Sequence, residues 1–214
     1  STVLEGGSVL KYPPYAAGLS VYVRGAFDCQ TLMYQPAVLC GRDDHTLGEV
    51  IGTNSLGGFY GDMPLYFYNT GTSIYLHDVR FSNLSYGPAF YQNTANTLRH
   101  IQIVNTRSGI YLNAAGQLRA GNVLMTYLAG TGYAVEFVNS PATVVGEHWT
   151  LHSVPRLRNG TATLNLTNSL LVEVTDASGY AGSGNAATTD VGVFQTFGAG
   201  NYYLSGSPYA NLNV

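Results

Sequence analysis

One motif returns through the middle of the chain at an interval of about 22 residues, and it constrains the fold more than any other feature. Segments 76–83 (LHDVRFSN) and 98–105 (LRHIQIVN) match in register: apolar, two polar, apolar, polar, apolar, small, Asn. Each is followed by a Gly-containing turn and a second short apolar segment, 89–91 and 110–112. No helical pattern separates the copies. A strand-sized motif with this spacing is typical of a coiled parallel sheet.

The rest of the chain extends the same pattern. A weaker third copy lies at 118–125, and Asn83 and Asn105 occupy equivalent strand-to-turn corners, which predicts an asparagine ladder between neighbouring coils. We predict a single all-β domain over 1–214, a parallel β-helix of roughly ten coils with little or no helix. Two irregular loops, 41–63 and 175–190, interrupt it. Further strands are expected at 7–12, 19–24, 37–40, 65–68, 74–76, 134–138, 147–151, 162–166, 168–174, 191–194 and 202–204.

Composition excludes some partners. Only 10% of the residues are charged, against about 25% in a typical domain. The net charge is -3, Lys11 is the single lysine, and no basic run is present, which argues against nucleic acid as the main partner. No apolar segment approaches the ~20 residues that span a bilayer, so a membrane-embedded state is not expected.

The compartment is inferred from the same data. The chain starts with Ser1, and we interpret it as a mature or excised piece of a longer precursor. Low charge and a surface rich in Tyr, Asn and Thr suggest a secreted or cell-surface protein. An oxidising compartment would permit a disulfide between Cys29 and Cys40, and the alternative is two small buried thiols.

The pattern resembles the right-handed parallel β-helix proteins, the pectate-lyase-like superfamily that includes polygalacturonases and phage tailspikes. A closer resemblance is to modules of large, mostly uncharacterised secreted β-helix proteins of environmental bacteria. The segments that resemble them are 5–12, 42–49, 98–103, 167–172, 193–200 and 202–209. The resemblance implies a right-handed coil and an extracellular or cell-surface module, but it implies no particular reaction.

No catalytic constellation is found in the sequence. The Asn-Thr-Asp, Gly-His-Gly and Arg-Ile-Lys segments of polygalacturonases are missing, and only Asp43–Asp44 imitates their paired aspartate. Asp43, Asp44 and Glu49 lie close together in a Gly-rich loop, where they form a candidate Ca²⁺ site; otherwise they belong to a salt-bridged turn. No other cofactor is expected. The five histidines do not form a zinc pattern.

Tyrosines are the remaining candidates for binding. Tyr60, Tyr66, Tyr68, Tyr202, Tyr203 and Tyr209 belong to groups near the two ends of the chain. Exposed aromatic rings stack on sugars and anchor protein interfaces.

The expected function is an extracellular structural or adhesive module that self-associates through uncapped coil ends into oligomers or filaments. The alternative is a carbohydrate-active enzyme (a polysaccharide hydrolase or lyase) or a carbohydrate-binding domain, acting on a polysaccharide near Asp43–Asp44 and loop 52–62.

Overall fold

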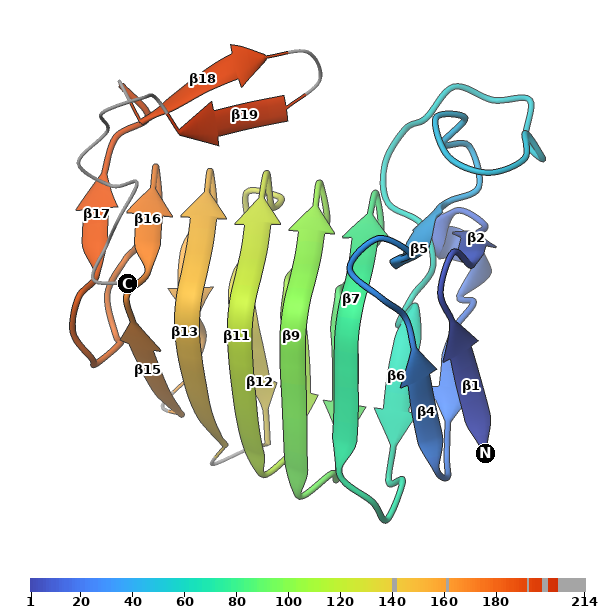
Figure 1. Ribbon diagram of the computed structural model, residues 1–214, viewed down its shortest axis with the longest axis horizontal. Helices are drawn as coiled ribbons and strands as arrows, with labels where there is room; N and C mark the ends of the chain where they lie inside the picture. The colour runs from blue at the N-terminus through green and yellow to red at the C-terminus, as the bar shows by residue number, and fades with distance from the viewer. Residues whose placement is uncertain (140–141, 161, 192, 198–199, 204–214) are drawn as a thin grey trace.

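The computed structural model describes residues 1–139, 142–160, 162–191, 193–197 and 200–203, and it is a parallel β-solenoid of about seven turns (Figure 1). Nine strands form the largest sheet: β2 (Val9–Tyr12), β5 (Ala37–Gly41), β7 (Ile74–Ser82), β9 (Ala95–Val104), β11 (Gln117–Thr126), β13 (Thr143–His152), β16 (Leu170–Val172) and β17 (Ala186–Thr188), with β15 (Thr163–Thr167) pairing β13. A six-stranded sheet contains β3 (Val21–Val23), β6 (Leu65–Tyr68), β8 (Pro88–Tyr91), β10 (Ile110–Asn113), β12 (Tyr133–Val138) and β14 (Arg156–Arg158).

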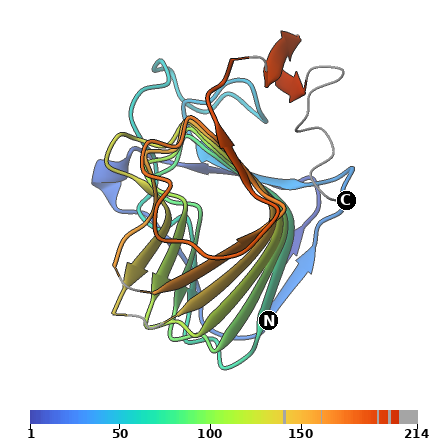
Figure 2. The same ribbon diagram turned by 90° about the vertical axis from the view of Figure 1, so that its left-hand side faces the viewer.

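Three short elements and one hairpin complete the described chain. β1 (Thr2–Glu5) pairs with β4 (Phe27–Gln30) at the N-terminal end, and η1 (Tyr15–Ala17) is a single 3₁₀ turn. β18 (Phe194–Phe197) and β19 (Gly200–Tyr203) form an antiparallel hairpin beside the last turns, a departure from the expected coil. The view along the coil axis shows the successive turns in register behind one another (Figure 2).

Each regular turn is built from three extended sides, and the corner that ends each side holds a residue with positive φ. In the turn that begins at Ile74 these residues are Asp78, Asn83 and Gln92, with φ of 50°, 59° and 53°. The left-handed region favours Asn and Asp among non-glycine residues because their short polar side chains bond locally. The Asn at the end of the sequence motif therefore marks a corner.

The predicted register and asparagine ladder are confirmed. Leu76 pairs with Leu98, and Asn105 Nδ2 donates to Asn83 Oδ1 at 2.6 Å. The third copy is displaced from its predicted position, because Leu98 pairs with Ala120 rather than Leu118. The copy is therefore 120–127, which restores the 22-residue spacing and places Tyr127 at the Asn position.

The core fills the inside of the coil with stacked columns of apolar side chains. Phe67 and Phe90 stack at 5.2 Å between ring centroids, and both are fully buried. At one interior position Leu76 and Leu98 are followed by Ala120 and then Gly146. These two small residues leave space that the indole of buried Trp149 occupies, and its Nε1 donates to the Ala120 carbonyl at 2.9 Å.

The expected number of coils, roughly ten, was too high. Val9 pairs with Val38 and Val38 with Arg80, so the first two turns contain 29 and 42 residues. The longer turn includes loop 41–63, which forms no strand of its own and makes isolated bridges only at Tyr60. The second predicted loop, 175–190, contains the short strand β17.

Candidate functional site

The acidic loop that follows β5 folds back on the solenoid, and its two aspartates are buried. Tyr60 Oη donates to Asp43 Oδ2 at 3.0 Å, and Arg42 Nε lies 3.4 Å from Asp43 Oδ1. Asp44 accepts bonds from the backbone and hydroxyl of Thr46, and from Asn83 Nδ2 at 3.2 Å. Asp44 thus terminates the asparagine ladder at its N-terminal end.

The candidate calcium ligands do not converge. Among the described residues, Asp43, Asp44 and Glu49 do not form a group whose carboxylate oxygens lie close enough together to share an ion. Lys11 Nζ donates to the backbone carbonyls of Asp44 and Glu49, both at 2.7 Å. A protein ammonium therefore uses the carbonyl oxygens that a loop-bound Ca²⁺ would need. The surface acidic pair expected for carbohydrate chemistry is likewise buried, at 3% and 5% exposure.

Tyr60 also differs from expectation, because it is a core residue. Its ring packs against Gly41, where a Cβ would lie 2.5 Å from ring carbon Cδ2, and the side chain is 1% exposed. Burial raises the pKa of the Tyr60 phenol, and its bond to Asp43 adds to that effect. The ring therefore stabilises the loop and cannot stack on a ligand.

Tyr66 and Tyr68, in contrast, lie on the outer side of the six-stranded sheet, where neighbouring rings cover Tyr66 (9% exposed) and Tyr68 is half-buried. We call this group of rings the tyrosine face: Tyr22, Tyr66, Tyr68, Tyr91 and Tyr111. Alternation along β6 places Phe67 in the core and the two tyrosines outside. Tyr68 and Tyr91 stack at 4.5 Å, and Tyr22 lies 5.4 Å from Tyr66.

The small side chain of Ala89 lets two rings of the tyrosine face approach each other. Tyr66 and Tyr111 both flank Ala89 in the register, and their ring centroids lie 6.4 Å apart above it. Arg24 places its guanidinium 4.9 Å from the Tyr68 ring centre and 5.5 Å from that of Tyr22. Cation–π contacts of this kind hold the rings and leave a positive group at the edge of the face. The result is a cluster of packed aromatic rings with the Arg24 guanidinium at one edge.

The other three predicted tyrosines lie at the C-terminal end of the sequence. Tyr202 and Tyr203 lie in strand β19, which pairs with β18. Tyr209 lies outside the described residues. The structure therefore brings together two of the six predicted tyrosines, and the sequence did not single out the remaining members of the face. Alternation with core Phe67 and Leu112 is the signal that would have identified them.

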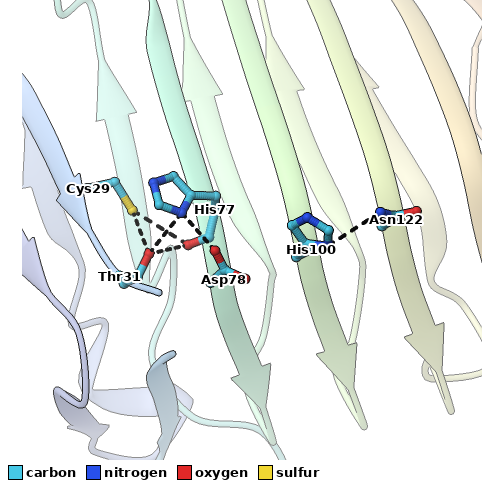
Figure 3. Close-up of polar contacts among 6 residues, drawn as sticks. All are labelled: Cys29, Thr31, His77, Asp78, His100 and Asn122. Carbon is cyan, nitrogen blue, oxygen red and sulfur yellow. Dashed lines mark hydrogen bonds and ion pairs between the residues drawn. The ribbon is translucent and has the colours of Figure 1, made fainter. Parts of the chain in front are cut away.

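A polar cluster between β4 and β7 combines residue types that occur in catalytic sites (Figure 3). His77 Nδ1 lies 2.9 Å from Asp78 Oδ2 and 3.4 Å from Thr31 Oγ1. Cys29 Sγ lies 3.2 Å from Thr31 Oγ1 and donates to the His77 carbonyl at 3.6 Å. Within the described residues the sulfur thus contacts the Thr31 hydroxyl and a carbonyl, not the imidazole that a Cys–His pair requires. The cluster links two strands but lacks an activated nucleophile.

Both cysteines are free thiols, so the disulfide alternative is not observed. Cys40 is fully buried beside Lys11 and Arg80, and burial raises the pKa of its thiol. In the corner column that contains Asp78, Asn122 Nδ2 lies 3.4 Å from His100 Nδ1 (Figure 3). These contacts continue the polar corner pattern along the solenoid.

The N-terminal end of the solenoid exposes apolar side chains. Among the described residues, eleven of the fourteen exposed large hydrophobic residues lie within positions 1–56. Five of them form what we call the N-terminal rim: Val3, Val9, Leu32, Met33 and Tyr34. Tyr34 is 89% exposed. The same end contains strands β2 and β3, each of which pairs with one described neighbour only. An open strand edge beside apolar side chains is a favourable surface for association.

Comparison of the chain with protein-family models, with curated proteins and with solved structures finds no match. Within the described part of the chain, no helix has the length and apolar character needed to cross a membrane.

Proposed function

We propose that this chain is an extracellular, non-catalytic structural or adhesive module that self-associates through the ends of its solenoid. The observation that supports this best is the N-terminal rim, where open parallel strand edges and exposed apolar side chains coincide. At the opposite end β17 and β14 also pair with one described strand each. Because the two ends differ, contact between them is heterologous, and repetition of such a contact produces an open filament.

The fold is compatible with the resemblance to the pectate-lyase-like superfamily and to secreted bacterial β-helix modules, and this resemblance supports a cell-surface or secreted location. The polar corner ladders and the low charge fit a rod that presents its sides to solvent and its ends to partners. The polar cluster around Cys29 and the buried Asp43–Asp44 pair favour binding or assembly over catalysis.

Sedimentation velocity over a wide concentration range tests the association. We expect oligomers whose size increases with concentration, and negative-stain microscopy should show rods joined end to end. Replacing Met33 and Tyr34 by Glu in the N-terminal rim should weaken association at least tenfold, because two charges would be desolvated in the contact. Both side chains are exposed, so the fold should be retained.

Tyr75→Glu is the matched control, since Tyr75 is 54% exposed but lies on β7, away from the ends. The proposal is wrong if the wild-type chain stays monomeric at millimolar concentration, or if the rim and control variants associate equally.

The tyrosine face favours a second candidate function, binding of a polysaccharide. Flat aromatic groups with phenol donors and a neighbouring guanidinium suit the apolar faces and hydroxyls of sugar rings. Affinity electrophoresis in neutral and acidic polysaccharides should show retardation by at least one polymer. Tyr22→Ala should abolish it, whereas Tyr75→Ala, which removes an exposed ring outside both the tyrosine face and the rim, should leave it unchanged.

The same polysaccharides separate binding from catalysis. New reducing ends or unsaturated products would identify an enzyme and overturn the non-catalytic proposal. Equal retardation of both tyrosine variants would place the binding site away from the tyrosine face.

A further inference from the structure

Three metal-ligating side chains meet near the C-terminal end of the solenoid, on three different turns. His152 ends β13, Glu173 follows β16, and Asp190 follows β17. His152 Nε2 lies 3.4 Å from Asp190 Oδ2 and 3.8 Å from Glu173 Oε2. The three ligand atoms all lie within 4.8 Å of one another. They form the one such group of His, Cys, Asp and Glu ligands in the described chain.

The surroundings fix this group in place. The side chain of His152 is 6% exposed, and its ring lies between Tyr127 and Phe194, with centroids 5.3 Å and 5.1 Å away. Ser153 Oγ donates to Glu173 Oε2 at 3.0 Å, so the carboxylate is oriented by a hydrogen bond from the same corner column. Support of a ligand by a second polar group is usual at metal sites.

Two observations favour an ion bound between these three side chains. Asp190 Oδ1 is buried and has no hydrogen-bond partner among the residues described, which is unfavourable for a carboxylate oxygen. A direct N–H···O bond would be about 2.9 Å long, yet both His152 separations are longer. Ligands bound at about 2.0–2.1 Å in a tetrahedron lie roughly 3.3 Å apart. The observed spacing suits a small ion held between the ligands.

The ligand types select the class of ion. An imidazole nitrogen is a poor ligand for Ca²⁺ or Mg²⁺, which prefer oxygen, whereas Zn²⁺ and neighbouring divalent transition ions accept one nitrogen with carboxylates. We propose that His152, Glu173 and Asp190 form a site for a divalent transition metal ion of the zinc type. The ion joins three consecutive turns at the end where the regular coils give way to β18–β19.

The proposal does not depend on self-association or on sugar binding, because each ligand belongs to the same chain. Since β17 is three residues long and, among the described strands, pairs only with β16, the turn that contains Asp190 is weakly held by backbone bonds. A bound ion adds a cross-link from this turn to the better-packed β13. Zinc should therefore raise the thermal stability of the C-terminal turns.

Isothermal titration of the tag-free, chelator-treated chain with zinc chloride tests the site. We expect one ion per chain with micromolar or tighter affinity, and a higher unfolding temperature in its presence. Glu173→Gln and Asp190→Asn should each weaken zinc binding at least about tenfold and remove most of the thermal shift. Both side chains are partly exposed, so these near-isosteric variants should fold.

Glu147→Gln is the matched control, because Glu147 is an exposed carboxylate on the same strand, β13, and lies outside the cluster. It should bind zinc like the wild type. Cobalt provides a second readout, since a nitrogen- and oxygen-ligated ion gives a visible absorption band that His152→Gln should remove. Lack of zinc binding at millimolar concentration, or equal binding by Asp190→Asn and Glu147→Gln, would overturn the proposal.

Discussion

Replacing Trp149 by valine should lower the free energy of unfolding by about 3–4 kcal/mol, because a fully buried indole leaves a cavity that its neighbours cannot fill. Val79, Ile101 and Val123 occupy the same position in earlier turns, so valine suits the backbone there. The change also removes the bond from Nε1 to the Ala120 carbonyl. Urea unfolding, followed by far-UV circular dichroism, measures the loss.

Exposed Tyr75→Ala is the control and should change the unfolding free energy by less than about 0.5 kcal/mol. A loss below about 1 kcal/mol in Trp149→Val would show that the column does not depend on the indole.

A double-mutant cycle with Gly146→Ala tests the same packing from the other side. A Cβ at Gly146 would lie 2.6 Å from Leu166 Cδ2 and 2.7 Å from Trp149 Cε2, so alanine overpacks the wild-type core and should destabilise it by about 1–3 kcal/mol. In the Trp149→Val background the added methyl enters the vacated space. Leu166 Cδ2, the end of a flexible side chain, still has to move, so Gly146→Ala should then be less destabilising than in the wild type, with a coupling energy of at least about 1 kcal/mol. Additive effects of the two substitutions would contradict the proposed exchange of volume.

The same packing explains why the repeated motif is clear in the middle turns of the sequence and fades in the later ones. Apolar side chains at constant spacing revealed the turns from Ile74 to Thr126, and Asn revealed their corners. At Ala120 and Gly146 the interior side chains are small because the bulk comes from Trp149, so the motif fades although the turn continues. A pattern of residue types detects a column only where each residue fills its own position.

The metal-type cluster was hidden for a different reason. His152 pairs with Val172 and Val172 with Thr188, so the last turns contain 20 and 16 residues. Extending the 22-residue spacing from His152 would not have aligned it with Glu173 or Asp190. The tyrosine face depends in the same way on register, since Tyr66 and Tyr111 meet only because Ala89 lies between them. Contacts between turns follow loop length, which residue types do not specify.

Raising the pH above about 10, the ordinary pKa of tyrosine, should unfold the protein cooperatively. Burial is the main cause that raises the pKa of five phenols in the folded chain: Tyr12, Tyr60, Tyr66, Tyr86 and Tyr111. Below pH 10 both states keep these protons, so their contribution to stability is fully present. Above it the unfolded chain releases protons that the folded chain retains, and stability decreases with pH.

The expected slope is about 1.4 kcal/mol per pH unit for each tyrosine that stays protonated in the fold. Circular dichroism and tyrosinate absorbance, recorded on the same samples, should show the buried phenols ionising together with the loss of the sheet signal. Tyr66→Phe removes one such phenol, which makes no hydrogen bond to the described residues, and should reduce the slope by about one proton. Tyr34→Phe, at an exposed ring, should leave it unchanged. The opposite result would be ionisation of all tyrosines near pH 10 while the sheet signal stays intact. It would mean that water reaches the phenol groups of these five tyrosines in the folded chain, so that their rings are not packed as the contacts between them require.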